Sequence, residues 1–215
     1  GAAAEFATCY EPTWGRHKAR TWPAVGNHEY NLGDANGYFG YFGAAAAGPG
    51  GYYAKDLGAW RIYVLNSECA FVPCSPGSAQ LQWLSADLAA EPRQCVLAIW
   101  HEPRFTSGPH GDSSWVQPFW DVLHAAGADV VLNGHDHQYE RFLPMNPQGG
   151  LDTARGMTEF IVGTGGVGGA TFTGTHANSA VKNGTTFGVL KLTLRATSYD
   201  WQFVPVAGKT FTDTG

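Results

Sequence analysis

Two apolar runs separated by a helical segment place the strongest constraint on the fold of this chain. Residues 95–100 are apolar without interruption, which is typical of a strand buried on both faces. Residues 114–126 are expected to form a helix that stops at Gly127, and residues 128–132 form the second apolar run. A strand, a helix and a strand with short joints predict a βαβ unit and therefore an α/β fold.

Other segments with regular periodicity add further strands. Residues 52–57 and 60–66 are expected to be two strands joined by a turn at Gly58. Residues 187–206 alternate apolar and polar side chains, which predicts a hairpin near the end of the chain.

A second helix is predicted from its N-cap, Ser78, to the residues just before Pro92. Leu81, Leu84 and Leu88 recur there at helical spacing. One face of this helix is therefore expected to pack on the sheet.

The first 51 residues give weaker signals. Residues 1–6 resemble the first turns of a helix, and residues 21–25 are expected to be a short strand that leads into a turn at Gly26. Residues 31–51 are rich in Gly, Ala and aromatic residues and are expected to be a loop. This loop could be a mobile flap near a functional site, or a surface loop whose aromatic side chains pack down onto the protein.

The composition fits one globular domain and argues against several partners. The 215 residues, of which 44% are hydrophobic and 14% charged, suit a single domain covering residues 1–215. The net charge of -5 gives no electrostatic reason to bind nucleic acid or an anionic membrane. No run approaches the roughly 20 apolar residues that span a bilayer, and no signal peptide is visible at the start.

The four cysteines are compatible with two disulfides. Cys69 and Cys74 bracket a short loop that contains proline and are expected to pair, which would leave Cys9 with Cys95. Four buried free thiols are the alternative. Asn183 begins an Asn-Gly-Thr glycosylation sequon. Together these features favour an oxidising setting, with the protein secreted or periplasmic.

Histidines, and in one case an asparagine, follow three of the expected strands. These residues are Asn27 with His28, then His101, then His135 with His137. Positions two apart on a strand point the same way, and ligands of open α/β sheets gather at the carboxyl ends of the strands. A single His-x-His would fit an exposed polar turn equally well. Three such strand ends together predict a metal site, with zinc, iron, manganese or a mixed pair as candidates.

The residue types at these strand ends favour a catalytic centre, because an Asn ligand is unusual in structural zinc sites. Two metal ions about 3.5–4 Å apart can hold a bridging hydroxide for in-line attack on phosphorus. His135 and His137 are placed to serve different ions of such a pair. His28, next to Asn27, could protonate the departing alkoxide as a general acid.

A glycine-rich string follows a short expected strand at residues 160–162. Residues 163–168 fit the pattern G-x-G-x-x-G of dinucleotide-binding sites. Residues 171–174 cannot easily start the helix that such a site requires, so a dinucleotide site is rejected. A Gly-rich loop close to the histidines is expected instead.

The histidine motifs resemble those of a known family. Residues 26–29 (Gly-Asn-His-Glu), 101–103 (His-Glu-Pro) and 134–137 (Gly-His-Asp-His) are similar in order and spacing to three motifs of the calcineurin-like metallophosphoesterases. Residues 139–141 (Tyr-Glu-Arg) are similar to the purple acid phosphatase branch. The resemblance covers about residues 5–170. It implies an αββα sandwich, in which two β-sheets are flanked by helices, and a binuclear metal centre with a metal-bound hydroxide as the nucleophile.

The resemblance also implies roles for individual residues. His28 would protonate or stabilise the leaving oxygen, and His110, nine residues after His101, would contact the substrate. An exposed loop residue is the alternative for His110. The ligands of the second metal of the family correspond to Asn27, His101 and His135, and a ligand of the first metal corresponds to His137.

The chain departs from the family at its beginning. The family's first two Asp motifs, one of which bridges the metals, have no counterpart before Gly26, nor has the iron-binding Tyr of the purple acid phosphatase branch. Glu5 and Glu11 are the only acidic residues there. The N-terminal strands are therefore expected to be missing, and a further segment could supply the Asp ligands. Two ions without a bridging carboxylate would repel each other, so the metal at His135 is expected to be held better than the metal at His137.

These features leave functions of two classes open. The leading hypothesis is a metal-dependent phosphoesterase that hydrolyses small phosphate monoesters. One alternative is a catalytically incomplete remnant that binds metal or phosphate. The other alternative keeps the enzyme but gives it phosphodiester substrates.

Overall fold

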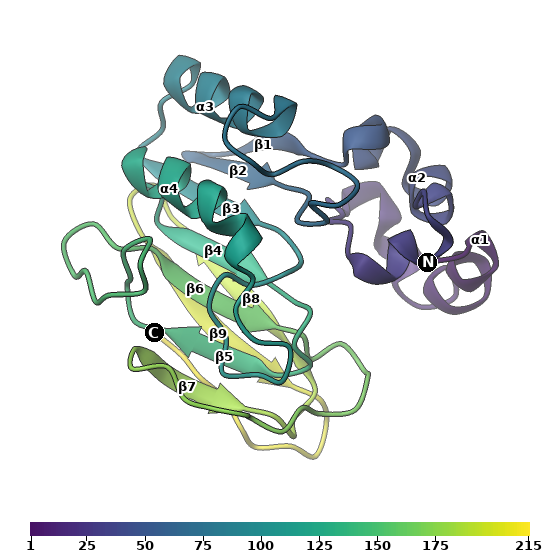
Figure 1. Ribbon diagram of the computed structural model, residues 1–215. Helices are drawn as coiled ribbons and strands as arrows, with labels where there is room; N and C mark the ends of the chain where they lie inside the picture. Colours follow the sequence, from purple (N-terminus) through teal and green to yellow (C-terminus); the bar gives the residue numbers. More distant parts are fainter.

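The computed structural model describes residues 1–215 and has a seven-stranded sheet at its centre (Figure 1). The strands lie in the order β1-β2-β3-β4-β6-β5-β7. Their bounds are β1 Tyr53–Leu57, β2 Trp60–Val64, β3 Cys95–Ile99, β4 Val130–Asn133, β5 Tyr139–Phe142, β6 Thr158–Val162 and β7 Ser179–Asn183. The α/β class predicted from the sequence is confirmed.

The middle of the sheet is parallel. Strand β3 pairs in parallel with β2 on one side and with β4 on the other, and β4 pairs in parallel with β6. The helix between β3 and β4 is α4 (Gln117–Ala125), which follows a 3₁₀ turn at Ser114–Val116. The predicted βαβ unit is therefore confirmed, and the carboxyl ends of β2, β3 and β4 lie at one edge of the sheet.

Helices α3 (Ala79–Ala90) and α4 cover one face of the sheet. The N-cap prediction for α3 is confirmed, because the Ser78 hydroxyl accepts a hydrogen bond from the Leu81 amide at 3.4 Å. The core between these helices and the sheet contains large side chains that are fully buried, among them Tyr63, Leu84, Trp100, Phe119 and Trp120.

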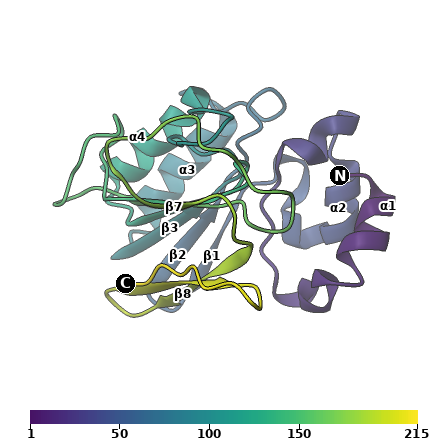
Figure 2. The same cartoon turned by 90° about the horizontal axis from the view of Figure 1, so that it is seen from below.

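A hairpin covers the opposite face of the sheet. It consists of β8 (Gly188–Leu194) and β9 (Tyr199–Pro205), as predicted, and forms a second, two-stranded sheet. Figure 2 shows β8 and the helices on opposite sides of the large sheet. Phe203 of the hairpin packs with Trp60 and Phe160 in a second core. The two helices, the large sheet and the hairpin thus form three successive layers, which correspond to the first three layers of the expected αββα arrangement.

Residues 1–50 form a helical lobe beside the sheet, called the N-terminal lobe below (Figures 1 and 2). It contains α1 (Ala3–Glu5), α2 (Asn36–Phe42) and short π and 3₁₀ turns. The prediction of a loop at residues 31–51 is therefore only partly right, although its aromatic side chains do pack down, with Tyr38 and Phe42 buried.

The strand expected at residues 21–25 is wrong. This segment is extended but pairs with no strand, and a 3₁₀ helix (Asn27–Leu32) follows it. Its Pro23 carbonyl accepts hydrogen bonds from the hydroxyls of Tyr38 and Tyr53, at 2.9 and 2.8 Å. The segment is thus held by side chains and not by a ladder of backbone hydrogen bonds.

One of the two expected disulfides is present. Cys69 and Cys74 are bonded, whereas Cys9 is an exposed free thiol and Cys95 a buried one. The pairing of Cys9 with Cys95 is wrong because Cys95 opens β3, in the core beneath the hairpin, while Cys9 lies on the N-terminal lobe. The alternative of four free thiols is also wrong. None of the helices is long and apolar enough to cross a bilayer.

Candidate functional site

The ends of β3 and β4 bring two of the predicted histidines into contact. His101 Nε2 lies 3.2 Å from His135 Nδ1 and 2.9 Å from the side-chain oxygen Oδ1 of Asn27. His101 and His135 follow neighbouring parallel strands, while Asn27 reaches them from the N-terminal lobe. Three of the four predicted metal ligands therefore converge on one point.

Of the two glycines beside the His101 ring, Gly26 leaves the space that this contact needs and Gly134 does not have to. A Cβ at Gly26 would lie 2.8 Å from the His101 ring, so only glycine allows the N-terminal lobe to approach so closely. A Cβ at Gly134 would lie 3.5 Å from the same ring, which is an ordinary contact. His135 itself adopts a left-handed backbone with φ +64°, a conformation that few non-glycine residues take.

Burial keeps the two rings neutral. The pKa of His101 is lowered to about 3, first by burial and then by the nearby positive charges that His135, His28, His137 and His110 would carry. The pKa of His135 is also lowered, mainly by burial. A neutral imidazole is the form that binds a metal ion, so the protonation state suits the predicted role.

His110 joins the cluster from the loop that follows β3. Its ring centroid lies 4.4 Å from that of His135, and its side chain is 48% exposed. His110 Nδ1 lies 2.7 Å from Oδ1 of Asp136, a fully buried carboxylate. The structure thus places the exposed His110 ring beside the predicted ligands and fixes its orientation through Asp136.

His137 and His28 lie at the margins of this cluster. The His137 ring centroid is 6.4 Å from that of His110, and the His137 carbonyl accepts a hydrogen bond from the Ala170 amide at 3.1 Å. The Gly-rich loop after β6 therefore does border the site, and no helix follows it. His28 is exposed, with Nδ1 3.3 Å from the Asn31 amide nitrogen.

Three buried carboxylates near His110 were not recognised in the sequence as a group. All three accept hydrogen bonds from the loop of residues 104–110. Asp136 accepts from Thr106 Oγ1 at 2.5 Å and from the His110 amide at 3.3 Å. Glu140 accepts from the amide and the hydroxyl of Ser107, at 2.9 and 2.6 Å, and Glu159 accepts from the Arg104 amide at 3.2 Å. The sequence could have indicated two of these carboxylates as neighbours of the site, because Asp136 stands between two histidines and Glu140 stands two residues after Gln138.

The remaining three histidines lie outside this cluster and have partners of their own. His17 contacts Arg20 at 2.8 Å, His124 contacts Asp152 at 3.2 Å, and His176 contacts Asp112 at 2.9 Å. None of these three belongs to the cluster around His101.

The donor set fits one metal ion better than two. Ligand atoms bound to one ion at about 2.1 Å lie about 3.0–3.4 Å apart, close to the separations at His101 Nε2. The set contains two neutral imidazoles and an amide oxygen but no carboxylate. No group of three or more His, Cys, Asp or Glu side chains is arranged to hold a metal ion. His137 belongs to no such group, and the carboxylate of the adjacent Asp136 already accepts hydrogen bonds from Thr106 and His110.

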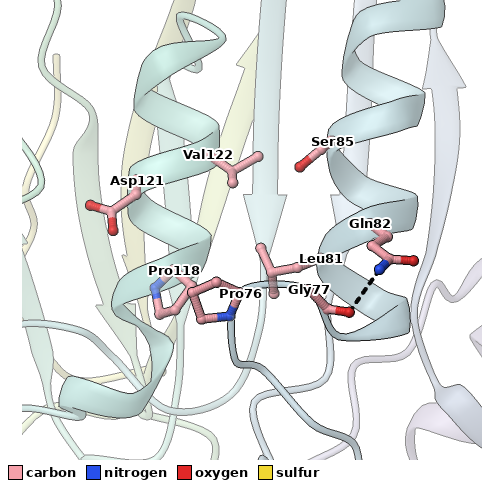
Figure 3. A pocket seen from close by; sticks show the side chains of 8 residues that line it. All are labelled: Pro76, Gly77, Leu81, Gln82, Ser85, Pro118, Asp121 and Val122. Carbon is pink, nitrogen blue, oxygen red and sulfur yellow. Dashed lines mark hydrogen bonds between the residues drawn. The ribbon is translucent and has the colours of Figure 1, made fainter.

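The cavity beside the histidines is distinct from a cavity on the helical face of the sheet. A cavity of about 530 Å³ lies between α3 and α4 and is lined by residues such as Leu81, Asp121 and Val122 without any histidine (Figure 3). A cavity of 360 Å³ borders His101 and Gly134 instead. The cavity between the helices therefore lies apart from the gathered histidines.

Known proteins resemble this chain in sequence. The chain is 28% identical over 155 residues to purple acid phosphatase 15 of Arabidopsis thaliana, which covers 61% of this chain and 29% of that protein. It is 29% identical over 164 residues to the probable purple acid phosphatase 20 of the same plant, which covers 64% of this chain and 38% of that protein. The chain thus spans about a third of the length of these relatives.

A solved structure shares the fold. The purple acid phosphatase PPD1 from yellow lupin (Lupinus luteus) seeds superposes with a TM-score of 0.67 at 20% identity, over 77% of this chain and 32% of that chain. This similarity supports the architecture of sheets and helices described above.

The family match itself covers the strand ends that carry the histidines. Residues 4–139 match the calcineurin-like phosphoesterase family, and this segment contains every predicted site residue. It runs from the N-terminal lobe to the start of β5. By this match the chain belongs to the calcineurin-like phosphoesterases.

Proposed function

We propose that this chain is the metal-binding part of a phosphatase that hydrolyses small phosphate monoesters. The observation that carries the proposal is the convergence of Asn27 Oδ1 and His135 Nδ1 on His101 Nε2, at 2.9 and 3.2 Å. These three residues would hold the ion, which as iron, zinc or manganese would act as a Lewis acid on a phosphoryl oxygen.

Two of the protein's own histidines would serve the leaving group and the phosphate. The side-chain nitrogen of Asn31 can only donate, so Nδ1 of His28 accepts from it and Nε2 carries the proton of the neutral ring. From Nε2, His28 would donate a hydrogen bond to the leaving oxygen, and in its imidazolium form it would give that oxygen the proton. Asp136 accepts from Nδ1 of His110, so Nε2 of His110 is left to donate to a phosphate oxygen when the ring is protonated at both nitrogens.

A second ion would depend on ligands from outside this chain. His137 is the one predicted ligand for it. The carboxylate of the adjacent Asp136 is fully buried and already accepts hydrogen bonds from Thr106 and His110. We propose that a segment of a longer protein supplies carboxylates there, in keeping with relatives that are about three times as long as the matched segment.

The test is hydrolysis of 4-nitrophenyl phosphate by protein loaded with each of the three metals. The His28→Ala variant should lose at least about 100-fold in rate, since general acid catalysis contributes about 10²–10⁴-fold. His17→Ala removes a histidine outside the cluster and should keep the wild-type rate. Equal rates for His28→Ala and the wild type would refute the role of His28. Faster turnover of bis(4-nitrophenyl) phosphate would make the protein a diesterase.

A second candidate function is metal or phosphate binding without catalysis. The absence of a carboxylate among the gathered donors favours it for this chain by itself. Metal content after dialysis, measured together with turnover, separates the two candidates. One ion per chain without turnover would support the binding function, and turnover would exclude it.

We also propose that the protein works in an oxidising compartment, secreted or periplasmic. The Cys69–Cys74 disulfide supports this, because such bonds persist where thiols are not kept reduced. Protein isolated from that compartment and then denatured should show two free thiols, those of Cys9 and Cys95. Four free thiols would contradict the proposal.

A further inference from the structure

A separate cavity lies at the carboxyl ends of β2 and β3, on the same edge of the sheet as the histidines. Its volume is about 330 Å³. The residues that line it share a position just after these strands or in the loop before α4: Ser67, Glu68, Cys69, Ala70, Glu102 and Trp115. Nothing in the function proposed above uses this cavity.

Glu68 is the unusual residue of this cavity. Only 8% of its surface is exposed, and its side chain forms neither a hydrogen bond nor a salt bridge. Its Oε1 atom is buried without any partner. A buried carboxylate that lines a cavity and has no partner in the protein is costly for the fold, so it indicates a partner from outside.

Glu102 brings a second carboxylate to the same cavity. It is 9% exposed and directly follows His101, so the two Cα atoms lie about 3.8 Å apart along the chain. One of its oxygens accepts a hydrogen bond from the Trp115 indole at 2.5 Å. No Lys or Arg pairs with Glu102 either, so two acidic groups face one cavity with no cation to neutralise them.

The residues that line the cavity indicate an organic cation. A bare metal ion would need at least three suitable ligands together, and no such group exists. Trp115 and Ala70 add apolar surface to the carboxylates. Indole is the best aromatic partner for a cation, and carboxylates with an aromatic wall are the surroundings that bind ammonium groups.

The walls of the cavity are already fixed in the free protein. Cys69, next to Glu68, is held by its disulfide with Cys74. The Glu68 amide donates to Asn66 Oδ1 at 3.0 Å, and Asn66 is bonded through its backbone to the Gln80 side chain. A rigid site loses little entropy on binding, which favours a small ligand.

We propose that this cavity binds the ammonium group of a phosphorylated amino alcohol, whose phosphate lies at the histidine cluster. The identity of the phosphate end rests on the proposed function, whereas binding of the ammonium group does not. Burial, followed by the negative charges of Glu102 and Glu29, raises the pKa of Glu68 to about 8. A bound ammonium group would oppose these effects and favour the ionised carboxylate.

The first experiment measures binding by calorimetry at pH 8, with choline and with its neutral isostere 3,3-dimethylbutan-1-ol as the probes. Choline should bind and the alcohol should not. Glu68→Gln should weaken choline binding about 10- to 100-fold, the loss expected for one contact to a charged group. Glu91→Gln, which removes a half-exposed acid at the end of α3, is the control matched in charge and should bind choline like the wild type.

The second experiment compares hydrolysis of choline phosphate and 3,3-dimethylbutyl phosphate by the metal-loaded protein. The proposal expects at least about tenfold higher kcat/KM for choline phosphate, which corresponds to about 1.4 kcal/mol. Equal binding of choline and the alcohol to the wild type would overturn it, even if Glu68→Gln failed to fold. Selective choline binding without turnover of either ester would leave the cation site standing and count against the proposed phosphatase. Equal turnover of both esters without choline binding would refute the cation site and support the proposed phosphatase.

Discussion

The two sides of the histidine cluster differ in what their carboxylates do. The side around His101 and His135 has donor atoms within 2.9 and 3.2 Å of one another and no carboxylate. The side around His110 and His137 has three buried carboxylates, Asp136, Glu140 and Glu159, which all hold the loop of residues 104–110. The number of acidic residues near a histidine is therefore a poor guide to metal binding, because their hydrogen bonds decide whether they are free to bind an ion.

The largest effect that would test this comparison is loss of the metal. His135→Ala should weaken metal binding more than about 100-fold, because it removes one of three converging ligands. His137→Ala should retain the ion with an affinity within about twofold of the wild type. Metal content after dialysis measures both. Equal loss of metal in the two variants would break the comparison.

A matched pair of glycine substitutions sharpens the comparison without touching a ligand. Gly26→Ala would press a methyl group onto the His101 ring at 2.8 Å, whereas Gly134→Ala would leave it at 3.5 Å. The first change should weaken metal binding about 10- to 100-fold, the usual effect of disturbing what supports a ligand. The second should leave the affinity close to that of the wild type. Competition with a coloured chelator measures both, and similar affinities for the two variants would count against the close approach of the N-terminal lobe.

The carboxylate side should respond in stability and not in metal content. Asp136→Ala leaves the buried Thr106 hydroxyl without its acceptor, which should cost about 1–3 kcal/mol in the free energy of unfolding. Asp136→Asn keeps an acceptor oxygen and should cost less. Urea denaturation gives both values. If Asp136→Ala also released the ion at His135, the two sides would not be independent.

The smallest effect is expected from pH. Complete burial raises the pKa of Glu159 well above its usual value, with Glu140 and Asp112 adding to the effect. The folded protein therefore keeps the proton at pH values where the unfolded chain has lost it, so this residue costs stability increasingly as the pH rises above about 4.5. Glu159→Gln should increase the free energy of unfolding more at pH 8 than at pH 5. Urea denaturation at the two pH values measures this, with Glu91→Gln as the control. An equal change at both pH values would show that Glu159 is ionised in the folded protein.

The central part of the fold could be predicted from the sequence because its signals are local. Ser78 caps α3 through an amide three residues away, and residues 95–100 are apolar enough to identify β3 without knowledge of its neighbours. Strands β5 and β7 were not predicted. They pair with each other across 36 or more residues, and neither has a pattern that marks it as a strand on its own.

The site could be predicted only as far as chain position implies proximity. The parallel strands bring His101 and His135 together, as expected. Residues 21–25 do not form a strand, yet Asn27 reaches the same point, because the tyrosine hydroxyls that hold Pro23 take the place of strand pairing. The role of Asp136 could not be foreseen, since it depends on a loop 30 residues earlier in the chain.

The backbone of His135 sets a limit on how this protein can be made more stable. A left-handed conformation costs a residue with a side chain about 1–2 kcal/mol, and glycine escapes this cost. Selection in the laboratory for heat resistance alone would therefore favour replacing His135 with glycine. The survivors of such selection would melt later and would have lost the His135 ring, one of the two groups that converge on His101, so any stability screen of this fold should be coupled to a screen for metal binding.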